Sequence, residues 1–187
     1  MQAEIERILL DRTAIAARVA QMGEQIARDL ELQTGADRLI VIPVMTGALV
    51  FAADLVRELP MRLRLELLEA SSYPGAATSS QGVSLGEGPK ADLAGSHVLI
   101  LDDIFDSGRT LAAVRTLVAQ YQPASTRSAV LLKKQVARAH DIGPDAEPDY
   151  VGFEVPDEFV VGYGLDYDGW FRNLPDIAVL RQASSTD

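Results

Sequence analysis

Hydrophobic residues recur at intervals of three and four near the start of the chain. The series comprises Ile15, Val19, Met22, Ile26 and Leu30. This spacing places all five side chains on one face of an α-helix, and it predicts an amphipathic helix over about residues 11–32. Further along, the spacing changes to dense apolar runs, which are typical of buried strands.

Strands and helices alternate through the middle of the sequence. Strands are expected at 38–44, 98–103 and 128–133, with a half-exposed strand at 61–67 and short strands at 150–154, 159–163 and 177–180. Helices are expected over 48–59 and 110–121. This alternation predicts an α/β fold, in which a parallel sheet is flanked by crossover helices. Ligands of such sheets bind beyond the carboxyl ends of the strands.

Residues 71–90 interrupt the pattern. They are rich in Ser, Gly, Thr, Ala and Pro and have no clear periodicity. A stretch of this length without periodicity indicates either a mobile functional lid or a disordered insert.

Composition limits the classes of protein that the chain could belong to. Its 187 residues, 48% of them hydrophobic, suit one domain over 1–187 with a sizeable core. The formal net charge of -10 argues against a general nucleic-acid binder, and fits a protein that handles polyanionic ligands through divalent cations. No cysteine is present, which excludes disulfides, Cys-zinc sites and thiol catalysis and fits a reducing cytoplasm.

No membrane segment is expected. The longest uncharged apolar run, residues 39–53, is shorter than the roughly 20 residues that a membrane helix needs. Glu4 and Glu6 in the first segment argue against a secretory signal.

The most informative segment is VLILDDIFDSGRTL, residues 98–111. A buried strand runs into Asp102 and Asp103, and a third carboxylate, Asp106, follows after two apolar residues. Adjacent carboxylates repel each other unless a ligand or metal compensates their charge. They could bind two vicinal ribose hydroxyls or help to hold Mg²⁺, although two solvated loop acids, or the strand-end acids of a receiver domain, would give the same letters.

The turn after these acids has the composition of a phosphate site. Gly108 allows the backbone to turn tightly, and Ser107 and Thr110 offer hydroxyls. The amides at the start of the following helix are free to bind a phosphate. An ordinary strand-to-helix loop with Asp and Ser as caps is the alternative.

The whole segment resembles the phosphoribosyl pyrophosphate (PRPP) signature of the type I phosphoribosyltransferases. A second segment, residues 148–172, resembles the purine and pyrophosphate end of the hypoxanthine-guanine phosphoribosyltransferases. The likeness continues through TGALVFAADL, ASSYPG, LLKK and NLPDIAVL, so that it covers about residues 39–180. It implies a core over roughly 38–135, a small hood built from the N-terminal segment and roughly 148–180, and a mobile lid loop.

The resemblance assigns the phosphate and ribose contacts. The residues implied to cradle the 5′-phosphate are Asp106, Ser107, Gly108, Arg109 and Thr110. Asp102 and Asp103 would bind the ribose hydroxyls, directly or through Mg²⁺. Asp106 would also take a proton from the purine as the general base.

The resemblance also assigns the purine and pyrophosphate contacts. Lys134 would donate to the purine 6-oxo group, Phe159 would stack on the base, and Val160 would contact its edge through the backbone. Asp166 would lie at the purine end and help Asp102 to hold Mg²⁺ beside the pyrophosphate.

The pyrophosphate itself would be bound by Arg172 and by the loop at Thr46 and Gly47. Thr46 is a departure, because the family usually has Lys or Arg at this position. Ser72 and Tyr73 match the lid, which would exclude water from the reaction.

The function implied is purine salvage: Mg²⁺-dependent transfer of the phosphoribosyl group from PRPP to hypoxanthine or guanine, giving IMP or GMP and pyrophosphate. A cytoplasmic homo-oligomer, dimer or tetramer, is implied, with no nucleic-acid or membrane partner. Three alternatives stay open: a nucleotide-sensing regulator of the same fold that binds RNA, a receiver domain, and a transferase that prefers xanthine or adenine.

Overall fold

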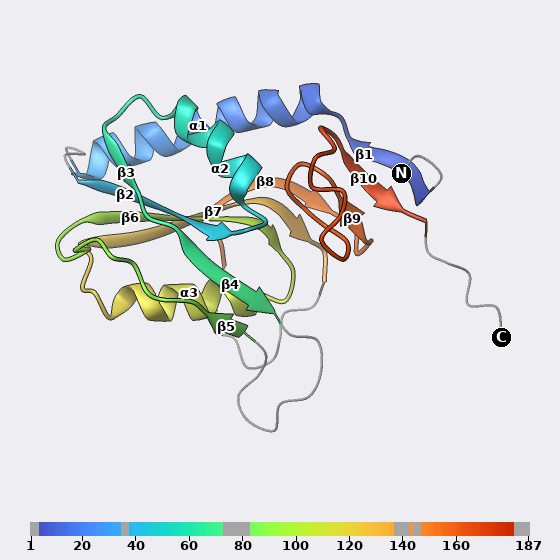
Figure 1. The fold of residues 1–187 in the computed structure, drawn as a ribbon. Coiled ribbons are helices and arrows are strands. Elements are labelled where there is room, and N and C mark those ends of the chain that lie inside the picture. The colour runs from blue at the N-terminus through green and yellow to red at the C-terminus, as the bar shows by residue number, and fades with distance from the viewer. Residues whose placement is uncertain (1–3, 35–37, 73–82, 137–142, 144–146, 182–187) are drawn as a thin grey trace.

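The computed structural model describes residues 4–34, 38–72, 83–136, 143 and 147–181 (Figure 1). Its elements, in chain order, are β1 (Ile5–Leu10), α1 (Arg12–Thr34), β2 (Leu39–Met45), α2 (Leu49–Leu55), η2 (Val56–Glu58), β3 (Leu63–Leu65), β4 (Leu68–Ser72), β5 (Val83–Leu85), β6 (His97–Phe105), α3 (Arg109–Ala119), β7 (Ser125–Lys134), β8 (Tyr150–Val155), β9 (Val160–Val161) and β10 (Ile177–Leu180).

The main sheet is mostly parallel, which confirms the predicted α/β class. Its strand order is β5-β4-β2-β6-β7-β8, and β3 also pairs with β2. All neighbours from β4 to β8 are parallel, and only β4 and β5 run antiparallel. Helices α1 and α2 cover one face of this sheet and α3 covers the other (Figure 1).

Each face of the main sheet has its own hydrophobic core. The predicted stripe of α1, from Ile15 to Leu30, is at most 3% exposed and packs with Phe51 and Leu55 of α2 against the sheet. On the other face, Leu111 and Val114 of α3 pack against the strands. The two cores fix β6 between α1, α2 and α3, so the carboxyl end of β6 is held at a defined place.

A second, antiparallel sheet has the strand order β1-β10-β9. It forms a hood beside the carboxyl end of the main sheet (Figure 1). Arg12 joins it to α1 through an ion pair with Asp176, in which Nη2 lies 3.1 Å from Oδ2. The predicted hood range of 148–180 includes β8, but β8 pairs with β7 in the main sheet, because its buried residues extend the core on that face. The assignment of residues 1–187 to one domain stays a prediction.

Three local predictions differ from the structure. The strand expected at 61–67 is only three residues long as β3, and a second strand, β4, begins at Leu68. Part of the segment expected to lack regular structure forms the antiparallel pair of β4 and β5, in which Ser72 pairs with Val83. Strand β1 was not predicted, because its apolar residues alternate poorly and it is ordered by pairing with β10, far away in the chain.

In the parts of the chain that the structure describes, no helix combines the length and the apolar character needed to cross a membrane.

Candidate active site

The two adjacent carboxylates lie near the end of β6, which continues to Phe105 rather than ending at residue 103 as predicted. Asp102 is buried, with 6% of its surface exposed, whereas Asp103 is partly buried. Burial and the neighbouring Asp103 raise the pKa of Asp102 well above its usual range, and burial also raises the pKa of Asp103. The Asp103 amide donates to Asp102 Oδ1 at 3.1 Å, and the Ile104 amide donates to Asp103 Oδ1 at 2.8 Å.

The turn that follows presents backbone amides to an incoming anion. Gly108 occupies the N-cap of α3 with φ +84°, a left-handed conformation that favours glycine. No side chain makes a capping hydrogen bond there, so the amides of the first turn of α3 are not satisfied in the way that an ordinary Asp or Ser cap would satisfy them. Asp106 is exposed and does not act as a cap. This geometry favours an anion site over an ordinary strand-to-helix loop.

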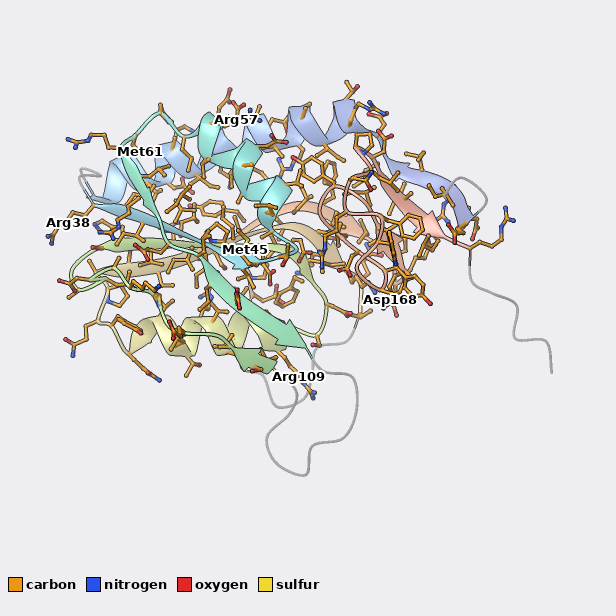
Figure 2. The ribbon with its side chains drawn as sticks, viewed as in Figure 1. Arg38, Met45, Arg57, Met61, Arg109 and Asp168 are labelled. Carbon is orange, nitrogen blue, oxygen red and sulfur yellow. The ribbon has the colours of Figure 1, made fainter. Side chains whose placement is uncertain are left out.

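Four segments that are far apart in sequence line one cavity of about 430 Å³, one of them through Ala70 of β4. The residues that the sequence singled out and that the cavity brings together are Thr46, Gly47, Asp102, Asp103, Asp106, Ser107, Gly108, Thr110, Asp166 and Arg172. They come from the β2–α2 connection, the β6–α3 segment and the loop after β9. Met45, Arg109 and Asp168, which mark these segments, lie toward the same end of the main sheet, whereas Arg38 and Met61 lie at the opposite end (Figure 2).

The β2–α2 connection lies directly against the acidic strand end. A Cβ atom on Gly47 would be 1.9 Å from Asp103 Oδ2, so only glycine fits there while Asp103 keeps its position. The peptide bond between Met45 and Thr46 is cis. Thr46 is exposed and lines the cavity.

Arg172 faces these segments from the loop after β9. Its Nη1 donates to the carbonyl oxygen of Gly164 at 2.6 Å, and its Nη2 lies 2.7 Å from Asp166 Oδ1. Asp166 Oδ2 in turn accepts a hydrogen bond from the Gly169 amide at 2.8 Å. The guanidinium charge acts against the effect of burial on the pKa of Asp103. Among the described residues that line the cavity, Arg172 is the one cation beside four carboxylates.

Lys134 lies at the margin of the cavity, at the end of β7. Its Nζ is 3.1 Å from Asp157 Oδ1 and 3.7 Å from Asp106 Oδ2, and its side chain is 14% exposed. The neighbouring Lys133 instead pairs with Glu147 at 2.9 Å and has a side chain that is 28% exposed. Lys134 is therefore the lysine that contacts a cavity residue.

Five predicted residues that the structure describes are outside the lining of the cavity: Ser72, Arg109, Lys134, Phe159 and Val160. Phe159 is 44% exposed, which is unusual for a phenylalanine that opens an apolar strand, and its ring meets Tyr167 edge to face at 5.3 Å. Val160 is buried and pairs with Val179 in the hood sheet. Of the predicted lid, Ser72 ends β4, and Tyr73 lies outside the described residues.

The described residues fit a hydrated magnesium ion better than a cage made only of protein. No group of three or more potential metal-ligating side chains converges in the described parts of the chain. Mg²⁺ commonly keeps several waters and takes one or two carboxylates together with substrate phosphates. Asp102 and Asp166 line the same cavity, and a cation there would compensate the charge that burial disfavours at Asp102.

Sequence reasoning missed two features of this site. Ile104 lines the cavity between Asp103 and Asp106 and offers an apolar surface beside the acids. The position of Ile104 between Asp103 and Asp106 is a sequence signal from which this contact could be predicted. The second feature is the contact of the loop after β9 with two segments: Tyr163 bonds to Asp54 of α2, and Gly164 lies against Gly47 of the β2–α2 connection. The sequence holds no local signal for either contact.

Comparison with known proteins shows the family to which this chain belongs. The family model described as the phosphoribosyl transferase domain matches residues 7–168. The hypoxanthine-guanine phosphoribosyltransferase of Mycobacterium tuberculosis (strain ATCC 25618 / H37Rv) is 41% identical over 181 residues, which cover 95% of this chain and 87% of the relative. The hypoxanthine phosphoribosyltransferase of Haemophilus influenzae is 36% identical over 167 residues, which cover 89% of this chain and 90% of the relative.

Solved structures agree with these relatives. The crystal structure of a hypoxanthine phosphoribosyltransferase from Staphylococcus aureus superposes with a TM-score of 0.86 at 30% identity, and the match covers 100% of this chain and 97% of that one.

Proposed function

Because this chain belongs to the phosphoribosyltransferase family, and within it to the hypoxanthine-guanine phosphoribosyltransferases, we propose that it works in purine salvage. It transfers the 5-phosphoribosyl group from PRPP to N9 of hypoxanthine or guanine, and it releases IMP or GMP together with pyrophosphate.

The observation that carries this function is the convergence of two kinds of anion site on one acidic strand end. The uncapped first turn of α3 follows Gly108, and Arg172 faces it across the same cavity, with Asp102 and Asp103 on the strand end. A ligand with a phosphate at one end, a diol in the middle and a pyrophosphate at the other end matches that order. PRPP has this arrangement.

We assign the 5′-phosphate to the turn from Asp106 to Thr110. The amides of α3 and the hydroxyls of Ser107 and Thr110 supply donors, and the helix dipole favours the anion. Arg109 lies outside the cavity lining, so its contribution is the backbone amide at the first position of α3 rather than a side-chain contact. Asp102 and Asp103 are assigned to the ribose hydroxyls.

Asp106 is proposed as the general base. It is exposed, lines the cavity and lies 3.7 Å from Lys134, so it is accessible to a purine. The N9 lone pair forms the bond to C1′, pyrophosphate leaves with the electron pair of the C1′–O bond, and the proton on N7 passes to the Asp106 carboxylate.

Lys134 is proposed to select 6-oxopurines. Its ammonium group donates hydrogen bonds only, so it suits the 6-oxo oxygen and is a poor partner for the 6-amino group of adenine. Phe159 is exposed and available to stack on the base, with Ile104 offering the apolar surface beside the acids. Val160 would contact the edge of the base through its backbone.

Arg172 is proposed to bind the pyrophosphate, because a guanidinium pairs with phosphate oxygens in a bidentate way. Asp102 and Asp166 would hold Mg²⁺, which supplies charge stabilisation for the departing pyrophosphate. The lid is assigned to Ser72 and Tyr73, whose closure would keep water from the anomeric carbon.

We further propose that the protein is a homo-oligomer, either a dimer or a tetramer, in the cytoplasm. Leu49, Leu65 and Leu67 are 49%, 48% and 60% exposed, and large apolar side chains exposed to this extent favour a subunit contact. Light scattering of the purified protein measures its mass directly.

The experiment that tests the function mixes the protein, Mg²⁺ and PRPP with each of hypoxanthine, guanine, xanthine and adenine, and detects the nucleoside monophosphate. We expect IMP and GMP. Formation of the xanthine or adenine nucleotide instead would show that the enzyme prefers that base to hypoxanthine and guanine. RNA binding without base transfer would indicate a regulator, which the net charge of -10 disfavours.

A further inference from the structure

The pyrophosphate end of the cavity is assembled from two segments that lie more than a hundred residues apart in the chain. Thr46 and Gly47 come from the β2–α2 connection, and Asp166 and Arg172 come from the loop after β9. A pyrophosphate that contacts both segments needs them in a fixed relation, so whatever fixes that relation acts on binding.

The two segments meet backbone to backbone. Gly164 has φ +103°, and a Cβ atom on it would lie 2.5 Å from the carbonyl oxygen of Gly47. The carbonyl oxygen of Gly164 accepts the hydrogen bond from Arg172 Nη1. The position of Gly164 therefore determines both how closely the loop approaches Gly47 and where the Arg172 guanidinium lies.

The residue before Gly164 is fastened to α2. The hydroxyl of Tyr163 donates to Asp54 Oδ2, and the other oxygen of Asp54 accepts a hydrogen bond from Arg57. Tyr163 is 7% exposed and has φ +52°, so it is a buried residue in an uncommon backbone conformation. Burial and Asp54 together raise the pKa of Tyr163, which keeps the hydroxyl protonated as a donor.

We propose that Tyr163 and Asp54 are positioning residues for the pyrophosphate end. Their hydrogen bond holds Gly164 against Gly47 and so places Arg172 opposite the β2–α2 connection. This inference rests on the proposed function. By this inference, α2 influences the affinity for pyrophosphate although none of its residues is assigned a contact with the substrate.

A matched control lies elsewhere in the chain. Tyr150 is also buried, at 3% exposed, and its hydroxyl donates to Asp29 Oδ2 at 3.0 Å. Burial and Asp29 raise its pKa to about 12. This pair joins β8 to α1, and neither residue lines the cavity. Tyr150→Phe thus removes a comparable Tyr–Asp bond without touching the pyrophosphate end.

The test measures the binding of Mg²⁺-pyrophosphate by calorimetry and the KM values in both directions for wild type, Tyr163→Phe and Tyr150→Phe. For Tyr163→Phe we expect the Kd for Mg²⁺-pyrophosphate and the KM for PRPP to rise about 10-fold, with the KM for IMP unchanged. In an Arg172→Lys background, Tyr163→Phe adds less than about 2-fold, since both changes act through the same guanidinium. Tyr150→Phe should leave the Kd and both KM values as in the wild type.

The proposal is overturned if Tyr163→Phe only lowers the melting temperature, or if Tyr150→Phe weakens pyrophosphate binding equally. Should Tyr163→Phe fail to fold, Asp54→Ala removes the acceptor from a side chain that is 35% exposed, and the same rise in Kd is expected. A wild-type protein that binds Mg²⁺-pyrophosphate but transfers no base would count against the proposed function alone. The calorimetry would still decide the role of Tyr163 in that case.

Discussion

At one end of the cavity, the contacts proposed for phosphate and ribose come from a single run of residues, from Asp102 to Thr110. At the other end, the contacts proposed for pyrophosphate come from two segments that lie against each other at Gly47 and Gly164. The first end depends on the end of β6 and the start of α3, which the two cores hold in place. The second depends on the loop after β9 and on the hydrogen bond from its Tyr163 to Asp54 of α2. Substitutions at the first end should therefore affect only the contacts that they remove, whereas substitutions far from the second end can still change pyrophosphate binding.

The largest effect is expected at the contiguous end. Asp106→Asn should lower kcat by about 10²- to 10⁴-fold, because the amide cannot take the proton, while PRPP binding is largely kept. Steady-state kinetics and a PRPP titration measure the two quantities. Asp157→Asn is the matched control, since Asp157 is an exposed carboxylate that also faces Lys134, at 3.1 Å. Wild-type turnover in Asp106→Asn would remove Asp106 as the base.

The second effect concerns the choice of base. Lys134→Ala should lower the ratio of kcat/KM for guanine over adenine by roughly 10- to 100-fold, because a hydrogen bond to a charged group contributes about 1.5–3 kcal/mol. Competition assays with the two bases give the ratio directly. Lys133→Ala, which removes the lysine paired with Glu147, should leave it unchanged. An unaltered ratio in Lys134→Ala would count against a role in recognising the 6-oxo group.

A smaller effect is expected at the assembled end. Arg172 is the one cation among the described cavity residues, and Thr46 contributes only a hydroxyl and backbone groups. Thr46→Lys should lower the KM for PRPP and pyrophosphate by about 2- to 5-fold, as an exposed charge does at ordinary ionic strength. Thr46→Gln supplies length without charge and should not reproduce the gain. If both variants behave alike, charge does not limit binding at this end.

The smallest effect is on stability. The pKa of Asp102 is raised in the folded state, so the folded protein binds more protons than the unfolded chain between the ordinary Asp value of 3.8 and the raised value. Stability therefore falls as the pH rises through that window. Asp102→Asn should flatten this dependence and raise the melting temperature at pH 7 by about 2–4 °C for each kcal/mol relieved. Thermal unfolding without Mg²⁺ between pH 4 and pH 8 measures it, and an unchanged slope would contradict the prediction.

The same contrast explains what the sequence could predict. The run from Asp102 to Thr110 is local, so its letters alone indicated a strand, an acidic end and a tight turn before a helix, and the structure differs mainly in extending the strand to Phe105. The phosphate-binding role of the turn stays a prediction. The helix that carries Ile15 to Leu30 followed from its spacing for the same reason. Lys134, Phe159 and Arg172 came from the resemblance, because isolated residues carry no spacing signal.

Long-range contacts explain what could not be predicted. Tyr163 reads as one aromatic residue in an apolar stretch, and its bond to Asp54 exists only after the hood has folded over α2. Strand β1 is ordered by β10, and the pairing of β4 with β5 is concealed by the Ser- and Gly-rich composition around it. In each case the partner residues are too distant in sequence for periodicity to reveal them.

The pairing of β1 with β10 also bears on the order in which the molecule forms on the ribosome. The amide of Arg181 donates to the carbonyl oxygen of Glu4 at 2.9 Å, and β1 pairs with β10. Because β10 is synthesised much later than β1, the hood sheet cannot be completed until β10 has been made. Most of the main sheet can assemble while synthesis continues, since domains commonly begin to fold from the N-terminal side during translation. A nascent chain stalled before residue 177 would thus contain the acidic strand end without the completed hood. The proposed pyrophosphate site would therefore be the last part of the cavity to form.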